Sequence, residues 1–115
     1  MKKSFNQLSP AQAERLALLM EEMGEAQQII GKILRHGYDN YHPRDPEKTT
    51  NRTLLATEMG HVYCAMQLLV IPQDISGLII ELSRSEKREK VQQWMHHQGN
   101  KLSSKQPKKR KNHDQ

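Results

Sequence analysis

The sequence has a single cysteine, few aromatic residues and no long hydrophobic run. With Cys64 alone, the 115-residue chain forms no internal disulfide, and this cysteine usage fits a reducing compartment. The residues after the basic start, Ser4 to Gln7, lack the apolar core of a signal peptide, and no run has the length of a membrane span. We therefore expect a cytoplasmic protein without a membrane segment.

Several catalytic signatures are also missing. There is no GxSxG nucleophile elbow, no Walker loop and no Rossmann glycine pattern. The histidines have no zinc-ligand spacing with Cys64, which argues against a zinc site. Any chemistry must therefore come from other residues.

Hydrophobic residues are scarce, at 35%, and aromatic residues make up only 4%. A chain of this length forms one domain, and its core must be lean and built of Leu, Ile and Met. A lean core favours assembly into oligomers. We expect one domain over residues 1–100 and a basic, disordered tail over residues 101–115.

The tail supplies much of the formal charge of +5, through the basic run from Lys105 to Lys111. Without the tail, the positive and negative charges of the remaining chain nearly balance, and the chain contains acidic clusters. The net charge is therefore a poor guide to the partners of the folded part. Nucleic acid is therefore expected only as a weak partner, held through phosphates by this tail with strong salt dependence.

The first helix is expected from Pro10 to about Leu34. Ser9 is a suitable N-cap, Pro10 fits the first helical position, and Gly37 provides a stop after two basic residues. Its apolar residues recur at spacings of three and four. They are Leu16, Leu19, Met20, Met23, Ile30 and Leu34.

A loop is expected over residues 38–50, followed by two more helices. The second helix, capped by Thr50 or Asn51, extends to about Val70. The third extends from about Asp74 to His97, with a kink or break expected near residues 83–85. No alternating strand pattern is present, so we expect an all-α antiparallel helical bundle.

Two acids of the first helix share a flank with apolar residues. At 100° per residue, Leu18, Glu22, Glu25 and Ile29 gather on one side. This arrangement indicates that the flank also faces protein and that the acids are partly enclosed. The alternative is that Glu22 and Glu25, together with Glu21, form an ordinary solvated face.

Glu58 is the most informative residue of the second helix. It falls in the middle of an apolar stripe, flanked by Leu54, Val62 and Ala65, and His61 lies at the edge of that stripe. An ionised Glu on a core face needs a partner, because its desolvation is costly. One alternative is an ion pair with Lys32 or Arg35.

A metal site is the other alternative. Glu22 and Glu25 are three residues apart, and so are Glu58 and His61, so each pair lies on one side of its helix. If the two helices pack antiparallel, these four potential ligands face one another. Carboxylate-rich sites suit Mg²⁺ or Mn²⁺.

Glu21, Glu22 and Glu25, followed by Glu58 and His61, resemble the EExxE…ExxD signature of the MazG-like all-α nucleoside triphosphate pyrophosphohydrolases. The likeness covers about residues 12–98. It continues in the segments from Lys32 to Gly37, Asn51-Arg52, Glu58 to Val62, and from Lys90-Val91 to His96-His97-Gln98. The chain is also similar in size to the small phage members, the MazZ type.

The resemblance implies a helical bundle assembled as a homodimer or homotetramer. It also implies hydrolysis of a nucleoside triphosphate between the α- and β-phosphates, giving a monophosphate and pyrophosphate. Glu22, Glu25 and Glu58 match metal ligands of the family, and Glu21 matches a further ligand or a position beside the attacking water. His61 replaces the family's Asp, and a neutral imidazole suits Mn²⁺ better than Mg²⁺.

Four basic residues are candidate phosphate ligands. Lys32 and Arg35 follow Glu25 on the first helix, Arg52 lies near the start of the second, and Lys87 is on the third. The alternative for each is an ordinary exposed base.

Three functions remain open. The first is a metal-dependent nucleotide pyrophosphohydrolase that shapes nucleotide pools, with dGTP or dATP as expected substrates. The second is a degenerate homologue that binds nucleotide or a partner without turnover, an idea that rests on His61. The third is a nucleic-acid-binding module that uses the basic tail.

Overall fold

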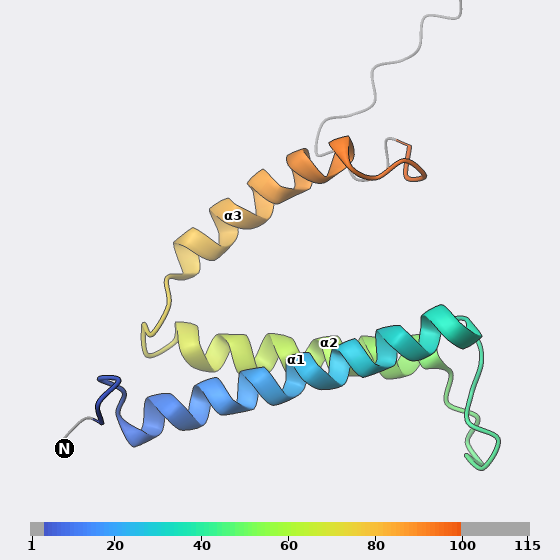
Figure 1. Cartoon of the computed structure of the whole chain (residues 1–115), viewed down its shortest axis with the longest axis horizontal. Coiled ribbons are helices and arrows are strands. Elements are labelled where there is room, and N and C mark those ends of the chain that lie inside the picture. Colours follow the sequence, from blue (N-terminus) through green and yellow to red (C-terminus); the bar gives the residue numbers. More distant parts are fainter. Residues whose placement is uncertain (1–3, 100–115) are drawn as a thin grey trace, which may run out of the picture. The chain divides into compact units, whose positions relative to one another are not determined.

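The computed structural model describes residues 4–99, and within this range the fold is all-α (Figure 1). Its elements are α1 (Pro10–His36), α2 (Asn51–Val70), α3 (Gly77–Lys90) and a 3₁₀ turn, η1 (Val91–Gln93). An isolated bridge between Tyr41 and Thr50 is the nearest approach to a strand in the described part. No described helix combines the length and apolar character needed to cross a bilayer.

The contacts divide the chain into two units, Met1–Ile75 and Ser76–Gln115, which are described separately. The first contains α1 and α2, and the second contains α3 and η1. The expectation of one domain over residues 1–100 stays a prediction, and the tail expected over residues 101–115 lies outside the described residues.

The ends of α1 are set by its capping residues. The Gln12 N–H donates to Ser9 Oγ at 3.1 Å, and the Ser9 N–H donates to Gln12 Oε1 at 2.8 Å, which completes a capping box. At the other end Gly37 has a φ of +90°, and its N–H donates to the Ile33 carbonyl. The expected start at Pro10 is confirmed, and the helix ends two residues after Leu34.

The second helix starts and ends where its sequence predicts. Thr50 is its N-cap and accepts a hydrogen bond from the Thr53 N–H at 3.3 Å. The helix extends to Val70, just before Pro72.

Contacts at both ends fix α1 and α2 as an antiparallel hairpin (Figure 1). Where the connecting loop joins them, Asn51 Nδ2 donates to the Gly37 carbonyl at 3.1 Å, and the Asn51 N–H donates to the Asn40 carbonyl at 2.9 Å. At the other end the Arg15 guanidinium donates to both carboxylate oxygens of Asp74, at 2.8 and 3.2 Å. The middles of the two helices are therefore held against each other.

The interface between the two helices follows a heptad-like pattern. In α1, buried or half-buried residues recur at alternating spacings of three and four: Gln12, Arg15, Leu19, Glu22, Ala26, Ile29 and Ile33. In α2 the same alternation selects Asn51, Leu55, Glu58, Val62, Ala65 and Leu69. Such spacing keeps one seam of each helix facing its partner. Glu22 and Glu58 both occupy seam positions, where apolar residues are usual.

The apolar stripe expected on α1 lies mostly outside this seam. Its exposed members are Leu16, Met20, Met23, Ile30 and Leu34, of which Leu34 is 82% exposed. The buried apolar residues in the described part are Ala26, Ala65 and Leu69. The hairpin therefore buries little apolar surface by itself.

The third helix begins later than the sequence suggested. It starts at Gly77 instead of Asp74, because Ser76 is the N-cap and accepts a hydrogen bond from the Ile79 N–H at 3.1 Å. Asp74 is not available as a cap, since its carboxylate pairs with Arg15.

The end of the third helix also differs from the expectation. The α-helix ends at Lys90, well before His97, and it continues through residues 83–85 without the expected break. Two side-chain pairs one turn apart stabilise this segment: Arg84 with Glu81, and Lys90 with Glu86.

Asn51 offers a test of how the hairpin is held together. Its residue exposure is 1%, and replacing it by Ala leaves the Gly37 carbonyl without its donor. We expect Asn51→Ala to lower the free energy of unfolding by about 1–3 kcal/mol. Thermal denaturation measures this, with Asn40→Ala as the control because only the Asn40 backbone bonds Asn51. Equal melting temperatures for both variants would contradict the anchoring role.

Candidate metal centre

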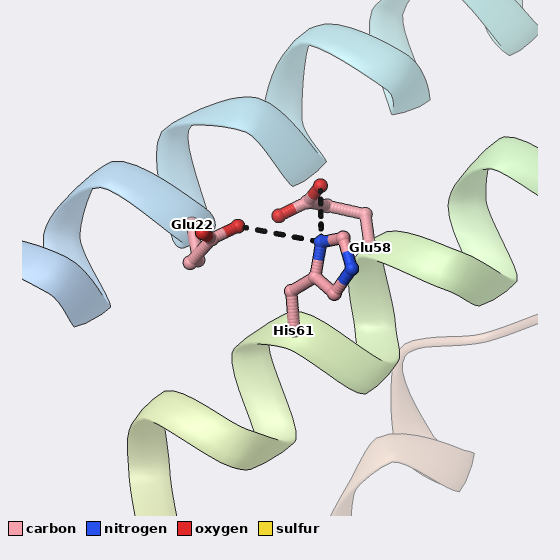
Figure 2. Close-up of side chains that lie close together, drawn as sticks. All are labelled: Glu22, Glu58 and His61. Atoms are coloured by element: carbon pink, nitrogen blue, oxygen red, sulfur yellow. Dashed lines mark hydrogen bonds and ion pairs between the residues drawn. The ribbon is translucent and has the colours of Figure 1, made fainter. Parts of the chain in front are cut away.

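Three side chains converge where the middles of α1 and α2 meet. Glu22 comes from α1, whereas Glu58 and His61 come from adjacent turns of α2 (Figure 2). One potential ligand atom from each residue lies within 4.8 Å of the others. These three residues are called the acidic cluster below.

The imidazole of His61 lies beside the two carboxylates, and its Nδ1 contacts both of them (Figure 2). Its Nδ1 is 3.3 Å from Glu58 Oε2 and 3.7 Å from Glu22 Oε2. The side chains of Glu58 and Glu22 are only 7% and 17% exposed, whereas that of His61 is 55% exposed. The cluster is thus sheltered by the helices on its acidic side and open to solvent at His61.

The neighbours of Glu22 change the pKa of its carboxyl group. The pKa of Glu22 is raised above its ordinary value, first by the hydrogen bond that its protonated form shares with Glu58, then by burial and by the negative charge of Glu58. His61 and Glu25 act in the opposite direction. The Glu22 carboxylate is therefore unfavourably placed as an anion unless a proton or a cation compensates it.

The acidic cluster has the properties of a cation site. Among the described residues, Glu22 Oε2 and Glu58 Oε1 are buried and have no hydrogen-bond partner. Buried charged oxygens without partners are costly, and a bound cation would satisfy both. Two carboxylates with one imidazole fit Mn²⁺ or a similar transition metal better than Mg²⁺, which prefers oxygen ligands.

The other two acids of the motif lie outside the acidic cluster. Glu21 and Glu25 are both exposed on α1. Glu25 is nevertheless close enough to Glu22 to lower its pKa through a side-chain hydrogen bond. Of the four expected metal ligands, the structure thus brings together Glu22, Glu58 and His61 and leaves Glu25 at the margin.

The expected basic residues lie in three different settings. Lys32 and Arg35 line a cavity at the end of α1, and within residues 4–99 neither forms an ion pair with Glu58. Arg52 donates to both oxygens of Asp39, at 3.0 and 3.3 Å, and its guanidinium carbon lies 4.8 Å from the Tyr38 ring centroid. Lys87 is exposed on α3, in the second unit.

Sequence reasoning missed the loop residues that border this cavity and the role of Asn51. The cavity wall includes Asn40, Tyr41 and His42 from the long connection between α1 and α2. The length of that connection was the available signal, since long ordered loops in small domains are often functional.

The interpretation of the acidic cluster as a candidate metal centre therefore depends on its geometry and on the spacing of its residues. The likeness to the MazG-like enzymes stays a prediction from the quoted motif. Comparisons with protein-family models, with curated proteins and with solved structures found no match to this chain.

Proposed function

We propose that the protein is a metal-dependent nucleotide pyrophosphohydrolase. It cleaves a (d)NTP between the α- and β-phosphates to (d)NMP and pyrophosphate, with purine deoxynucleotides such as dGTP or dATP as substrates and nucleotide-pool control as its role. One observation carries the proposal: two carboxylates from neighbouring helices, each with one buried oxygen that has no hydrogen-bond partner, meet beside an imidazole. An ordinary solvated face would not leave the side chain of Glu22 only 17% exposed.

In this proposal the acidic residues and His61 have different roles toward the cation and the substrate. Glu22, Glu58 and His61 would hold the divalent cation, and Glu25, which is exposed one turn from Glu22 on α1, would join them when substrate is present. A cation bound there neutralises phosphate charge and lowers the pKa of a bound water. Glu21 lies on the exposed side of α1 and serves the attacking water.

Burial of Glu58 contributes to the proposed chemistry through preorganisation. Because the seam holds Glu58 between the helices, its carboxylate needs little reorganisation when charge changes nearby. Lys32 and Arg35, the expected phosphate ligands, have no acidic partner in the described part of the chain, but they line a separate cavity that begins about 15 Å along α1 from Glu22. Arg52 is paired with Asp39, and Lys87 belongs to the second unit.

The proposal includes assembly into a homodimer or homotetramer in the cytoplasm. The exposed stripe of α1 and the few fully buried apolar residues support assembly, because the hairpin alone buries little apolar surface. Leu16, Met20 and Met23 also line an open apolar groove along α1. The single cysteine supports the reducing compartment.

The proposed reaction is tested by its products. The full chain is incubated with a panel of NTPs and dNTPs and either Mg²⁺ or Mn²⁺, and pyrophosphate and orthophosphate are measured separately. We expect pyrophosphate and a nucleoside monophosphate in equal amounts. Orthophosphate as the sole product would contradict cleavage between the α- and β-phosphates.

His61 gives a test of the cation preference. Replacing it by Asp supplies a third carboxylate, so we expect Mg²⁺-supported turnover to rise about tenfold, a typical effect of tuning a metal site. His97→Asp, an exposed position on the second unit, is the control. Unchanged or weaker activity of His61→Asp would show that His61 is not a substitute for a carboxylate ligand.

A second function follows from the position of the imidazole. A protonated His61 lies near enough to both carboxylates to offset their charge without a metal, at 3.3 and 3.7 Å. This arrangement favours a homologue that binds nucleotide or a partner without turnover. Measurable nucleotide binding with no hydrolysis, under any divalent cation, would support this alternative over the enzyme.

A further inference from the structure

A cavity of about 330 Å³ lies at the carboxyl end of α1. The helix contributes Lys32, Arg35 and His36 to its wall, and the following loop contributes Tyr41 and His42. Its volume falls within the range of small-molecule sites. The cavity lies well apart from the acidic cluster, because Lys32 follows Glu22 by ten residues, about 15 Å along the helix axis.

The wall of the cavity is basic and lacks any carboxylate. Lys32 and Arg35 form no ion pair with a described residue, in contrast to Arg15 and Arg52, which are both bound to aspartates. Two cations that share a cavity without a counter-charge repel each other. An anion bound between them would remove this repulsion.

The imidazole of His42, which lines the cavity, has one ring nitrogen engaged with the backbone of its own loop. Its Nδ1 accepts a hydrogen bond from the Arg44 N–H at 3.1 Å, so in the neutral ring the proton is on Nε2. The nearby acid, Asp45, is already engaged, because its two oxygens accept N–H bonds from Glu47 and Thr49 at 2.9 Å. His42 is therefore able to donate to a bound anion.

The loop that completes the cavity is held in place by the start of α2. Asn51 binds the carbonyls of Gly37 and Asn40, and the Arg52 N–H donates to the Tyr38 carbonyl at 2.8 Å. The bridge between Tyr41 and Thr50 fixes the next part of the loop. A site preorganised in this way loses little conformational entropy on binding.

We propose that this cavity is a metal-independent site for oligophosphate anions, with inorganic pyrophosphate as the smallest good ligand. The Arg35 guanidinium offers paired donors, which match phosphate oxygens bidentately, and Lys32 adds a point charge. Arg35 Nη1 lies beside Gly31, 3.4 Å from where a Cβ would be, so the guanidinium folds back along the helix over Gly31. The site stands without the proposed enzyme function, although pyrophosphate would be the product of that reaction.

Calorimetric titration of the full chain with inorganic pyrophosphate, in buffer containing EDTA, tests the site. We expect Lys32→Gln/Arg35→Gln to weaken binding at least tenfold, and Arg35→Lys to weaken it less. The matched control, Arg84→Gln/Lys90→Gln, removes the same charge from α3, where both bases are paired with glutamates, and is expected to change binding less than twofold. Equal weakening by both double variants, or sulfate binding as tightly as pyrophosphate, would overturn the proposal.

A second measurement needs no variant. In ¹H–¹⁵N spectra of the unaltered chain, pyrophosphate is expected to shift the amides of residues 32–42 most strongly. Shifts confined to residues 101–115 would assign binding to the basic tail and overturn the proposal. Because EDTA removes divalent cations, both measurements are independent of whether the protein hydrolyses nucleotides.

Discussion

Replacing Glu58 by Gln is expected to lower pyrophosphate release from a nucleoside triphosphate by about a thousandfold. The substitution keeps the shape of the side chain but removes a charged ligand from the most buried position of the acidic cluster. A bound metal ion contributes several kcal/mol to transition-state stabilisation, and roughly 4 kcal/mol corresponds to this factor. The rate of pyrophosphate release under saturating Mn²⁺ is the measurement.

The matched control for this experiment is Glu14→Gln. Glu14 is an exposed glutamate of α1, outside the acidic cluster, so its replacement is expected to leave the rate within twofold. Glu58→Gln should also leave the metal-free protein at least as stable as the unaltered chain, because Gln ends the repulsion with Glu22. A large loss of thermal stability together with the loss of activity would indicate a structural role for Glu58 instead.

Divalent cations are expected to reverse the pH dependence of stability. The folded-state pKa of Glu22 is raised, so its contribution is present below the ordinary glutamate pKa and is lost as the pH rises through the raised value. Without cation, the contribution of the cluster to the free energy of unfolding therefore falls with rising pH. With Mn²⁺ it rises, because ligand carboxylates must be deprotonated to bind.

The size of this effect follows from mass action. Mn²⁺ at a hundred times its dissociation constant adds about 2.7 kcal/mol to the free energy of unfolding. For a domain of this size that amounts to roughly 10–20 °C in melting temperature. The change in melting temperature caused by Mn²⁺ is measured by thermal denaturation with and without the ion. The pH range is 4 to 8, which starts near the ordinary glutamate pKa.

The variant Glu22→Gln distinguishes the contribution of the acidic cluster to the pH dependence of stability from that of other acids. The pKa of Asp74 is lowered by Arg15, so the contribution of Asp74 to the free energy of unfolding is lost as the pH falls. In acid this loss partly offsets the contribution of Glu22. Glu22→Gln removes only the cluster's contribution, and it is expected to abolish both the Mn²⁺ shift and its pH dependence. A Mn²⁺ shift of the same size in Glu22→Gln would be incompatible with a cation held by that carboxylate.

The hairpin was predictable from local signals. Ser9, Pro10 and Gly37 mark the ends of α1, and Thr50 marks the start of α2, because caps act through hydrogen bonds within a few residues. The burial of Glu58 was also predictable from sequence, because Glu58 lies in the middle of the apolar stripe of α2 and this stripe faces α1.

Features that depend on distant partners were not predictable. Asp74 was expected to begin a helix, but its carboxylate binds Arg15, 59 positions earlier, and Ser76 becomes the cap. The seam of α1 was predicted only in part: of the flank expected to face protein, Glu22 and Ile29 lie in the seam, whereas Leu18 and Glu25 are exposed. A heptad register that includes Arg15 and Glu22 has fewer apolar residues than the stripe beside it, so hydrophobic periodicity selected the stripe.

The role of Glu25 shows the same limit within the candidate site. Spacing alone puts Glu22 and Glu25 on one side of α1. It does not show which of the two faces α2. Glu22 falls in the seam and Glu25 at its exposed margin. Sequence spacing gave the set of acids, and only packing against α2 distinguishes its buried members.

Binding of Mn²⁺ followed by electron paramagnetic resonance tests most directly whether α1 and α2 share a cation. The signal of free Mn²⁺ is lost on binding, so a titration of the unaltered chain is expected to show saturable uptake. We expect Glu22→Gln and Glu58→Gln each to abolish that uptake, and Glu14→Gln to retain it. Undiminished Mn²⁺ uptake by the Glu22→Gln/Glu58→Gln double variant would contradict a cation site built from these two carboxylates.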